Sequence, residues 1–218
     1  MTFSPTFGRT FSPLFKPNSL AISGGVWLTG GIPAANCVAA WQAKGAASYD
    51  SSLIDLTGNG HVLSPSDYAP PWDAVNGWCT GRWRAGYTYY GLITDIVPQV
   101  GYSIAIRAVR VFDTGTKVFN SEYFALTLDF SIDGNLWART NSGYGGTATE
   151  GVFVLSGGKG YIDGTLVTTR TDTNNSTNPL SIGRGDNQGS KIYIKEVFIY
   201  SSTIDAQVAA LSAAMAAL

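Results

Sequence analysis

The dipeptide Asp163-Gly164 constrains the fold of this chain more than any other feature, because it joins two apolar runs at 161–162 and 165–167. Asp-Gly between apolar residues is the strongest short-range signal for a tight β-hairpin, since the turn needs residues that accept positive φ. Asp133-Gly134 gives the same signal further upstream. We therefore expect the C-terminal half of the chain to be antiparallel β structure.

Alternating or compact apolar runs predict the other strands. They are expected at 37–41, 53–56, 102–111, 123–132, 136–139, 180–182 and 192–200. The alternation slips near Glu196, which indicates a β-bulge, and we place Glu196 on the solvent face of its strand. The segment 55–60 reads as a turn that uses Asn and Gly for positive φ. Short strands, 26 glycines and only 13% charged residues indicate an all-β sandwich or jelly roll.

Several motifs occur in a characteristic order. They are LIDLTGNGH at 53–61, then xIDGxLV, PLSIG and I-x-EVxIY, followed by S-x-x-D and an Ala/Leu-rich helix. This order resembles laminin-G-like, concanavalin A-like lectin domains over most of residues 36–211. The segment ANCVAAWQAKGAASYDSSLIDL, with PPWDAVNGW after it, most resembles the domains of this family that structural proteins of tailed bacteriophages carry. The resemblance implies a concanavalin A-like jelly-roll sandwich in a virion protein of the tail, neck or capsid decoration.

The N-terminal residues contain a repeat, TFSPTFGR followed by TFSPLFKP. Proline at this density favours extended backbone, so we expect residues 1–22 to form an arm, 23–35 a linker, 36–201 the sandwich and 202–218 a helix. A disordered tail is the simpler alternative. We prefer an assembly arm that contacts other virion proteins or a neighbouring subunit of a homo-oligomer, trimer or higher, through its phenylalanines: Phe3, Phe7, Phe11 and Phe15.

The C-terminal helix carries one apolar stripe. Ser202 is its expected N-cap, with Asp205 three residues later. The stripe consists of Ile204, Val208, Leu211, Met215 and Leu218. It is predicted to pack on its own sandwich for the first turns, whereas a bundle of helices from several copies would need more heptads than the chain provides.

Aromatic residues crowd the region 68–90. On loops they form stacking platforms for sugar rings, and in β proteins they also fill the core, which is the more common role. The polar loop 171–178 offers further ligand contacts, but its spacing matches no calcium loop, so no metal and no cofactor are expected. The candidate ligand contacts are Trp72, Trp83, Tyr87, Tyr89, Asn174 and Asn175.

Bulk properties exclude some partners. A formal net charge of −1 without a basic run argues against nucleic-acid binding, and no apolar run is long enough for a membrane span. The N-terminus lacks the pattern of a signal peptide, so we expect synthesis in a host cytoplasm, location in the virion, and free buried thiols at Cys37 and Cys79. His61, the only histidine, has no nucleophile motif to serve and is expected to be a packed or solvent-facing residue.

Hydrolysis of a glycosidic bond needs two carboxylates flanking that bond. The only glutamates are Glu122, Glu150 and Glu196, each isolated in sequence, so we expect no enzyme and rank a glycoside hydrolase third. The favoured function is a non-enzymatic virion protein whose arm anchors it and whose lectin-like domain projects for adhesion or host-surface contact, including contact with a cell-surface glycan. The alternative is a carbohydrate-binding module outside a virion.

Overall fold

A computed structural model gives the structure of the chain for residues 32–33, 35–83, 88–112, 119–120, 126–130, 136–140, 143–148, 150–169, 179–183 and 191–218. The predicted arm and most of the linker lie outside these residues, and so does the polar loop 171–178. No helix in the described ranges is long and apolar enough to cross a membrane.

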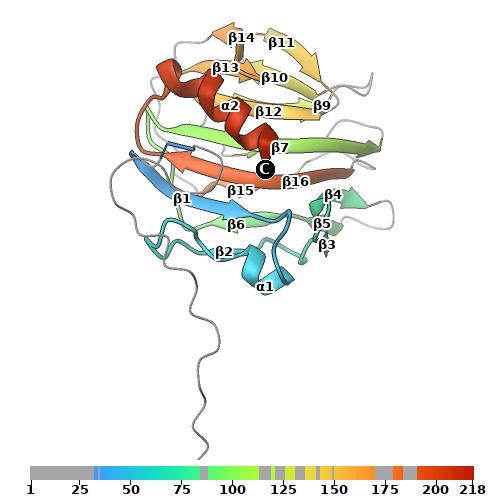
Figure 1. The fold of residues 1–218 in the computed structure, drawn as a ribbon. Coiled ribbons are helices and arrows are strands. Elements are labelled where there is room, and N and C mark those ends of the chain that lie inside the picture. Colours follow the sequence, from blue (N-terminus) through green and yellow to red (C-terminus); the bar gives the residue numbers. More distant parts are fainter. Residues whose placement is uncertain are drawn as a thin grey trace, which may run out of the picture.

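A large antiparallel sheet forms the main layer (Figure 1). Its order is β14 (Thr165–Thr169), β13 (Lys159–Ile162), β12 (Glu150–Ser156), β7 (Ser103–Phe112), β16 (Lys191–Tyr200), β4 (Gly77–Trp83) and β3 (Trp72–Asp73). Two further strands join it, β1 (Cys37–Gln42) on β16 and β5 (Thr88–Tyr90) on β4. The long strands β7 and β16 pair over almost their whole length and are the centre of the sheet.

Smaller sheets and short helices accompany the large sheet. One sheet has the order β2 (Leu63–Pro65), β6 (Leu92–Thr94), β15 (Ser181–Ile182) and β8 (Phe119–Asn120). The other has the order β11 (Gly143–Ala148), β10 (Leu136–Thr140) and β9 (Leu126–Phe130). The helices are α1 (Tyr49–Ser52), η1 (Asp205–Gln207) and α2 (Val208–Ala217). The predicted all-β jelly-roll sandwich with a short C-terminal helix is confirmed.

Two apolar clusters cover the two faces of the large sheet. Ile104 and Ile106 of β7 belong to the cluster between the sheets, whereas Ala105 belongs to the cluster under α2. Figure 1 shows α2 lying across that second face. The strand predicted at 102–111 is therefore present and buried on both sides, because successive side chains of a strand point to opposite faces. The cysteines are also as expected: Cys37 and Cys79 are buried thiols that form no disulfide, and burial raises the pKa of the Cys37 thiol to about 12.

The hairpin predicted at Asp163-Gly164 connects β13 to β14. Both turn residues have positive φ, 49° at Asp163 and 83° at Gly164, as a two-residue hairpin turn of this kind requires. Asp163 also ties the turn to β12, because its Oδ1 accepts a hydrogen bond from Val152 N at 2.8 Å and its own N–H donates to Val152 O at 2.9 Å. The second hairpin is confirmed by the pairing of β9 with β10; its Asp133-Gly134 tip lies outside the described residues.

The bulge predicted near Glu196 is present, because the register of β16 against β7 shifts between Ile194 and Glu196. The predicted solvent face is wrong, since Glu196 is fully buried. Its strand partner Arg107 donates from NH1 to the carbonyl of Met215 in α2. The expectation assumed an open sheet face, but the end of α2 lies over this part of the sheet.

No strand forms at 53–56, which corrects a second expectation. Helix α1 precedes this segment, begun by a capping box in which Ser48 Oγ accepts from Ser51 N at 3.1 Å and Ser51 Oγ accepts from Ser48 N at 2.8 Å. The predicted turn at 55–60 follows, but its positive φ angles occur at Gly58 and Gly60 alone and not, as predicted, at Asn59 as well. Side-chain hydrogen bonds to a neighbouring backbone compete with strand pairing in such Asp- and Ser-rich segments.

The C-terminal helix packs on its own sandwich as expected, and Val208, Leu211 and Met215 are buried in the cluster under α2. Its start differs from the prediction. Ser202 is not the N-cap; η1 begins at Asp205 and α2 at Val208. Neither start has a side-chain cap; Ser156 of β12 holds the residue before η1, because its Oγ accepts a hydrogen bond from Ile204 N at 2.8 Å.

Candidate functional site

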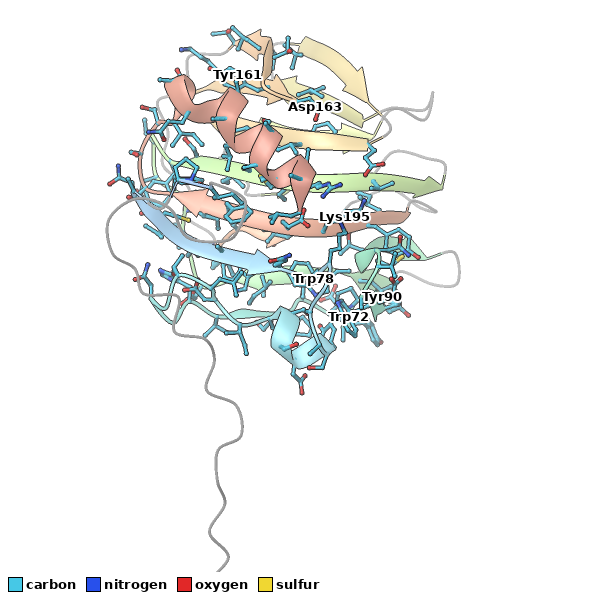
Figure 2. All side chains as sticks on the ribbon, viewed as in Figure 1. Trp72, Trp78, Tyr90, Tyr161, Asp163 and Lys195 are labelled. Carbon is cyan, nitrogen blue, oxygen red and sulfur yellow. The ribbon has the colours of Figure 1, made fainter. Side chains whose placement is uncertain are left out.

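Tyr68 and Tyr90 pack together at the end of the large sheet formed by β3, β4 and β5, and Trp72 lies on β3 at the same end. We call Tyr68, Trp72 and Tyr90 the aromatic edge. Trp72 of β3 pairs with Trp78 of β4, and Tyr90 of β5 pairs with Gly81 of β4. Tyr68 reaches the same place through an isolated bridge to Tyr90. Figure 2 shows Trp72 and Tyr90 on this side of the molecule.

The two tryptophans of β3 and β4 are held by hydrogen bonds from their indole nitrogens. Trp72 is half-buried, packs against the inter-sheet cluster, and donates from Nε1 to Ala43 O at 2.9 Å. Trp78 is fully buried and donates from Nε1 to Ser52 Oγ at 2.8 Å. Trp78 is therefore a core residue, whereas Trp72 forms a rigid wall at the border of the core.

Tyr68 provides the accessible surface of the aromatic edge. It is 56% exposed, and its ring centroid lies 5.9 Å from that of Tyr90 with the ring planes tilted by 45°. Tilted pairs at this distance are a favoured aromatic arrangement. The pair therefore fixes the orientation of an exposed ring, and a fixed, exposed ring is what a stacking platform for a sugar requires.

The turn between β3 and β4 beside this edge is rigid. Asp73 Oδ1 accepts from the backbone N–H groups of Val75 at 2.9 Å and Asn76 at 2.7 Å. Burial works against ionisation of Asp73, but the hydrogen bonds from Asn76 and Val75 outweigh it and lower the pKa of the carboxyl. Gly77 completes the turn with a φ of 87°, and a Cβ there would lie only 2.3 Å from Ile194 O. This turn holds Val75 in solvent, 72% exposed.

The structure describes some of the ligand contacts that the sequence predicted, and others lie outside the described residues. Trp72, Trp83 and Tyr89 lie on the adjacent strands β3, β4 and β5, but Trp72 pairs with Trp78, five residues along β4 from Trp83. Tyr87, Asn174 and Asn175 lie outside the described residues, as do the arm residues Phe3, Phe7, Phe11 and Phe15. Sequence reasoning did not choose Tyr68 or Tyr90 as contacts. A usable signal for Tyr68 was its setting between Ser66-Asp67 and Pro70-Pro71, a polar and proline-rich stretch that rarely enters a core.

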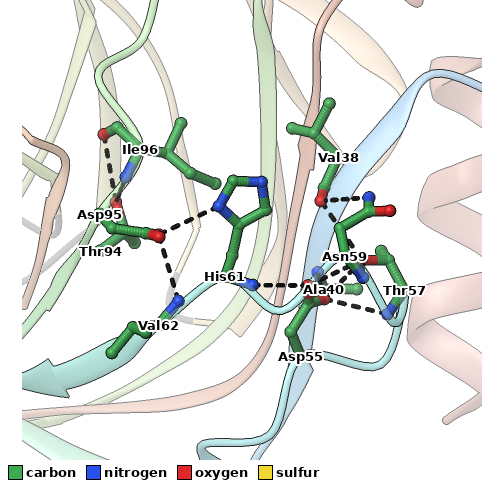
Figure 3. Close-up of polar contacts among 10 residues, drawn as sticks. All are labelled: Val38, Ala40, Asp55, Thr57, Asn59, His61, Val62, Thr94, Asp95 and Ile96. Atoms are coloured by element: carbon green, nitrogen blue, oxygen red, sulfur yellow. Dashed lines mark hydrogen bonds and ion pairs between the residues drawn. The ribbon is translucent and has the colours of Figure 1, made fainter.

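His61 lies beside a carboxylate that the sequence pattern did not reveal. Its Nδ1 is 3.1 Å from Asp95 Oδ1, which also accepts from Val62 N at 3.2 Å (Figure 3). The backbone N–H of His61 donates to Asp55 Oδ2 at 3.1 Å. Its side chain is 31% exposed, so the expectation of a surface or packed residue is met. These contacts hold the loop 55–62 against β1 and β6.

A charged cluster lies on the face of the large sheet that carries α2. Arg107 NH1 is 4.0 Å from Glu196 Oε1, and Arg107 NH2 is 3.8 Å from Glu150 Oε1. Lys195 donates to the same Glu150 oxygen at 2.8 Å, and this hydrogen bond is the main reason that the pKa of Glu150 is lowered. Burial raises the pKa of Glu196 from 4.5 to about 7, against the lowering effect of the cations Arg107, Lys44 and Lys195.

Metal binding finds no support in this part of the molecule. Among the residues that the structure describes, no group of three or more His, Cys, Asp or Glu side chains is arranged to hold a metal ion. The loop that sequence reasoning considered for calcium, 171–178, lies outside them.

Comparison with solved structures places the fold among lectin-like β-sandwich domains. The chain superposes on the binding domain of botulinum neurotoxin serotype D with a TM-score of 0.59 at 12% identity, over 84% of this chain and 51% of that one. A sialidase of Trypanosoma rangeli in complex with sialic acid gives 0.61 at 11% identity, over 90% of this chain and 36% of the enzyme. The binding domain of botulinum neurotoxin DC in complex with SialylT gives 0.56 at 12% identity, over 80% and 50%.

These likenesses concern the fold alone, because the identities are very low. The chain spans about half the length of the toxin binding domains and about a third of the sialidase. No protein-family model matches the sequence, and the comparison with curated proteins found no match.

Proposed function

We propose that this chain is a non-catalytic recognition domain that binds a carbohydrate at the aromatic edge. The observation that carries the proposal is the exposed ring of Tyr68, packed on the ring of Tyr90. The apolar face of a pyranose stacks on such a ring, and a tyrosine hydroxyl adds a directional hydrogen bond. The indole N–H of Trp72 on β3 is already bonded to Ala43 O, so it is not free to bind a ligand.

The solved structures with this fold support a carbohydrate as the ligand class. One is a sialidase in complex with sialic acid, and one is a neurotoxin domain in complex with SialylT. Another comes from botulinum neurotoxin type C, whose cell entry is dependent upon interaction with two ganglioside molecules. The extension to this chain is by analogy of fold, and fold alone does not determine function. The aromatic edge supplies the support at the level of the site.

The non-catalytic part of the proposal rests on the carboxylates. Glu150 and Glu196 are far apart in the sequence, but both lie near Arg107 in the structure. Glycosidases place the bond to be cleaved between their two carboxylates. Glu196 is fully buried, so a glycosidic bond has no access to the space beside it.

We further propose that the domain is carried by a tailed-phage virion, as the sequence resemblance implies. The arm 1–22 would anchor the subunit, and several copies in one particle would convert weak glycan contacts into high avidity. The alternative is a carbohydrate-binding module outside a virion, and finding the protein in virus particles would distinguish the two.

A glycan array tests the binding proposal. The purified full chain should bind a defined set of glycans, and Tyr68→Ala should lose that binding. Leu166→Ala is the matched control, because Leu166 is also exposed, at 50%, but lies on β14 at the opposite end of the large sheet. Absence of binding by the unaltered chain, or equal loss in both variants, contradicts the proposal. Release of free sugar from a bound glycan contradicts the non-catalytic part.

A further inference from the structure

Glu196 is a buried carboxylate without hydrogen-bond donors. It is fully buried at the bulge of β16, and neither Oε1 nor Oε2 has a hydrogen-bond partner. The cation beside it is Arg107, whose NH1 is 4.0 Å from Oε1. An ionised carboxylate in such a place is costly unless it is paired and hydrogen-bonded. The arrangement therefore suits the neutral acid and not the carboxylate anion.

Arg107 is engaged elsewhere in this arrangement. Its NH1 donates to Met215 O at 3.0 Å, and Lys44 Nζ donates to Leu218 O at 2.7 Å. The last carbonyls of a helix have no partner within the helix and carry partial negative charge, so cations placed there stabilise the helix end. Arg107 and Lys44 thus attach the last turn of α2 to the sheet.

The remaining charges around Glu196 come from neighbouring strands. Lys195 precedes it on β16 and is paired with Glu150 of β12. Glu150 is also 3.8 Å from Arg107 NH2. Helix α2 itself carries no ionisable side chain. Arg107 NH1 therefore contacts both Met215 O and, at 4.0 Å, Glu196 Oε1, whereas Lys44 holds Leu218 O and acts on Glu196 through its charge.

We propose that Glu196, Arg107 and the last turn of α2 form a pH-sensitive latch. When Glu196 is neutral, Arg107 NH1 bonds to Met215 O and the helix end is held. When Glu196 loses its proton, the buried anion draws Arg107 toward it, and Met215 O keeps only the Leu218 N–H as a donor. The last turn, then attached to the sheet through Lys44 alone, detaches more readily. The latch lies on the face under α2 and does not depend on glycan binding at the aromatic edge.

The last turn of α2 covers apolar surface that the latch would expose. Met215 and Leu211 are fully buried in the cluster under α2, together with Phe198 and Tyr200 of β16. Detachment of the turn would therefore open an apolar surface on the sheet. The latch would make the exposure of this surface depend on pH near neutrality.

Hydrogen exchange of the full chain at pH 6 and pH 8, corrected for the intrinsic pH dependence of exchange, tests the latch. In the unaltered protein, protection of the amides in the last turn of α2 should fall by about tenfold or more at pH 8, since one unit of pKa corresponds to a tenfold change in population. In Glu196→Gln the protection should be the same at both pH values. Asp50→Asn, which removes an exposed carboxylate on α1 outside the charged cluster, should behave like the unaltered protein.

Two further measurements keep the test decisive if Glu196→Gln does not fold. Arg107→Gln should show low protection of the last turn at both pH values, because Met215 O has lost the Arg107 donor. A carbon-13 titration of the glutamates in the unaltered protein should show one carboxyl that titrates near neutral pH. Protection of the last turn that is independent of pH in the unaltered protein, or a pH dependence retained in Glu196→Gln, overturns the proposal.

Discussion

At the scale of single residues, Asp55 accepts hydrogen bonds from backbone N–H groups at the edge of β1, where no further described strand pairs. Its Oδ1 accepts from Ala40 N at 3.1 Å and Thr57 N at 2.9 Å, and its Oδ2 accepts from His61 N at 3.1 Å (Figure 3). Asn59 Nδ2 donates to Val38 O at 2.8 Å on the same edge. Unpaired backbone groups on a sheet edge invite aggregation. The loop 55–59 covers this edge with side chains.

Replacing Asp55 should therefore be costly. Asp55→Ala leaves two backbone N–H groups of the loop and one of β1 without an acceptor, and we expect a loss of about 3 kcal/mol in the free energy of unfolding. Denaturant unfolding measures it. Asp95→Ala is the control, because that carboxylate is exposed, and its loss should be below about 1 kcal/mol. Equal losses in the two variants would show that Asp55 has no special role.

This residue also explains a failed expectation. The apolar run 53–56 has the composition of a strand, and the sequence alone predicted one. The competing structure depends on contacts between Asp55 and Ala40, which are distant in sequence and were not visible in the local pattern. The hairpin at Asp163-Gly164, by contrast, was predictable because the two residues specify the turn locally.

At the scale of elements, the β13–β14 turn and helix α2 are in direct contact. A Cβ on Gly164 would lie 2.9 Å from Ala209 Cα, in the first turn of α2. Gly164 also has a φ of +83°, where glycine is favoured. The helix can approach the sheet this closely because the turn residue has no side chain.

Substitutions at two glycines distinguish the cost of alanine at positive φ from the cost of a clash between its Cβ and a neighbouring helix. Gly164→Ala and Gly60→Ala both place alanine at positive φ, but a Cβ on Gly60 would meet nothing within 4 Å. Gly60→Ala should cost about 1 kcal/mol, and Gly164→Ala should cost about 1–3 kcal/mol more because the helix must shift. Thermal or denaturant unfolding compares them. Equal costs would mean that α2 is not packed against the turn.

The pH dependence of stability should report on Glu196. Its folded-state pKa is raised from 4.5 to about 7, so the folded protein binds more protons than the unfolded chain between these values. Stability therefore falls as pH rises from about 4.5 to about 7, by about 3 kcal/mol in total. Glu150, Asp73 and Asp205 have lowered pKa values, so their contribution is lost only in acid and is constant above about pH 5.

Unfolding of the unaltered protein and of Glu196→Gln from pH 5 to pH 8 measures this contribution. The fall in stability should be absent in the variant. A fall in stability that persists in Glu196→Gln would contradict its assignment to Glu196. The burial of Glu196 itself was not predictable, because the strand pattern does not reveal where α2 docks.

At the scale of the whole molecule, the aromatic edge depends on the order of strands. The sequence identified the crowd of aromatic residues and chose Trp72, Trp83 and Tyr89, which the structure carries on adjacent strands. It could not separate the buried Trp78 from the half-buried Trp72. That difference follows from the position of β3 at the border of the sheet and from α1, which supplies Ser52 to Trp78.

The arm can be tested on the whole protein by light scattering. The full chain should assemble into a trimer or a larger oligomer, and a version lacking residues 1–22 should be a monomer with the same unfolding midpoint, because the sandwich and α2 carry the described core. If both versions are monomers, the arm does not join copies of this chain, and anchoring to a different protein remains to be measured with virion components.

Isothermal titration with a glycan selected on the array measures the binding that we propose for the aromatic edge. We predict that Tyr68→Ala weakens binding at least about tenfold, equivalent to about 1.4 kcal/mol. Tyr68→Phe should retain most of the affinity because the ring still stacks, and Leu166→Ala should change nothing. Unchanged affinity in Tyr68→Ala, with the fold intact, would show that the aromatic edge is not the binding surface.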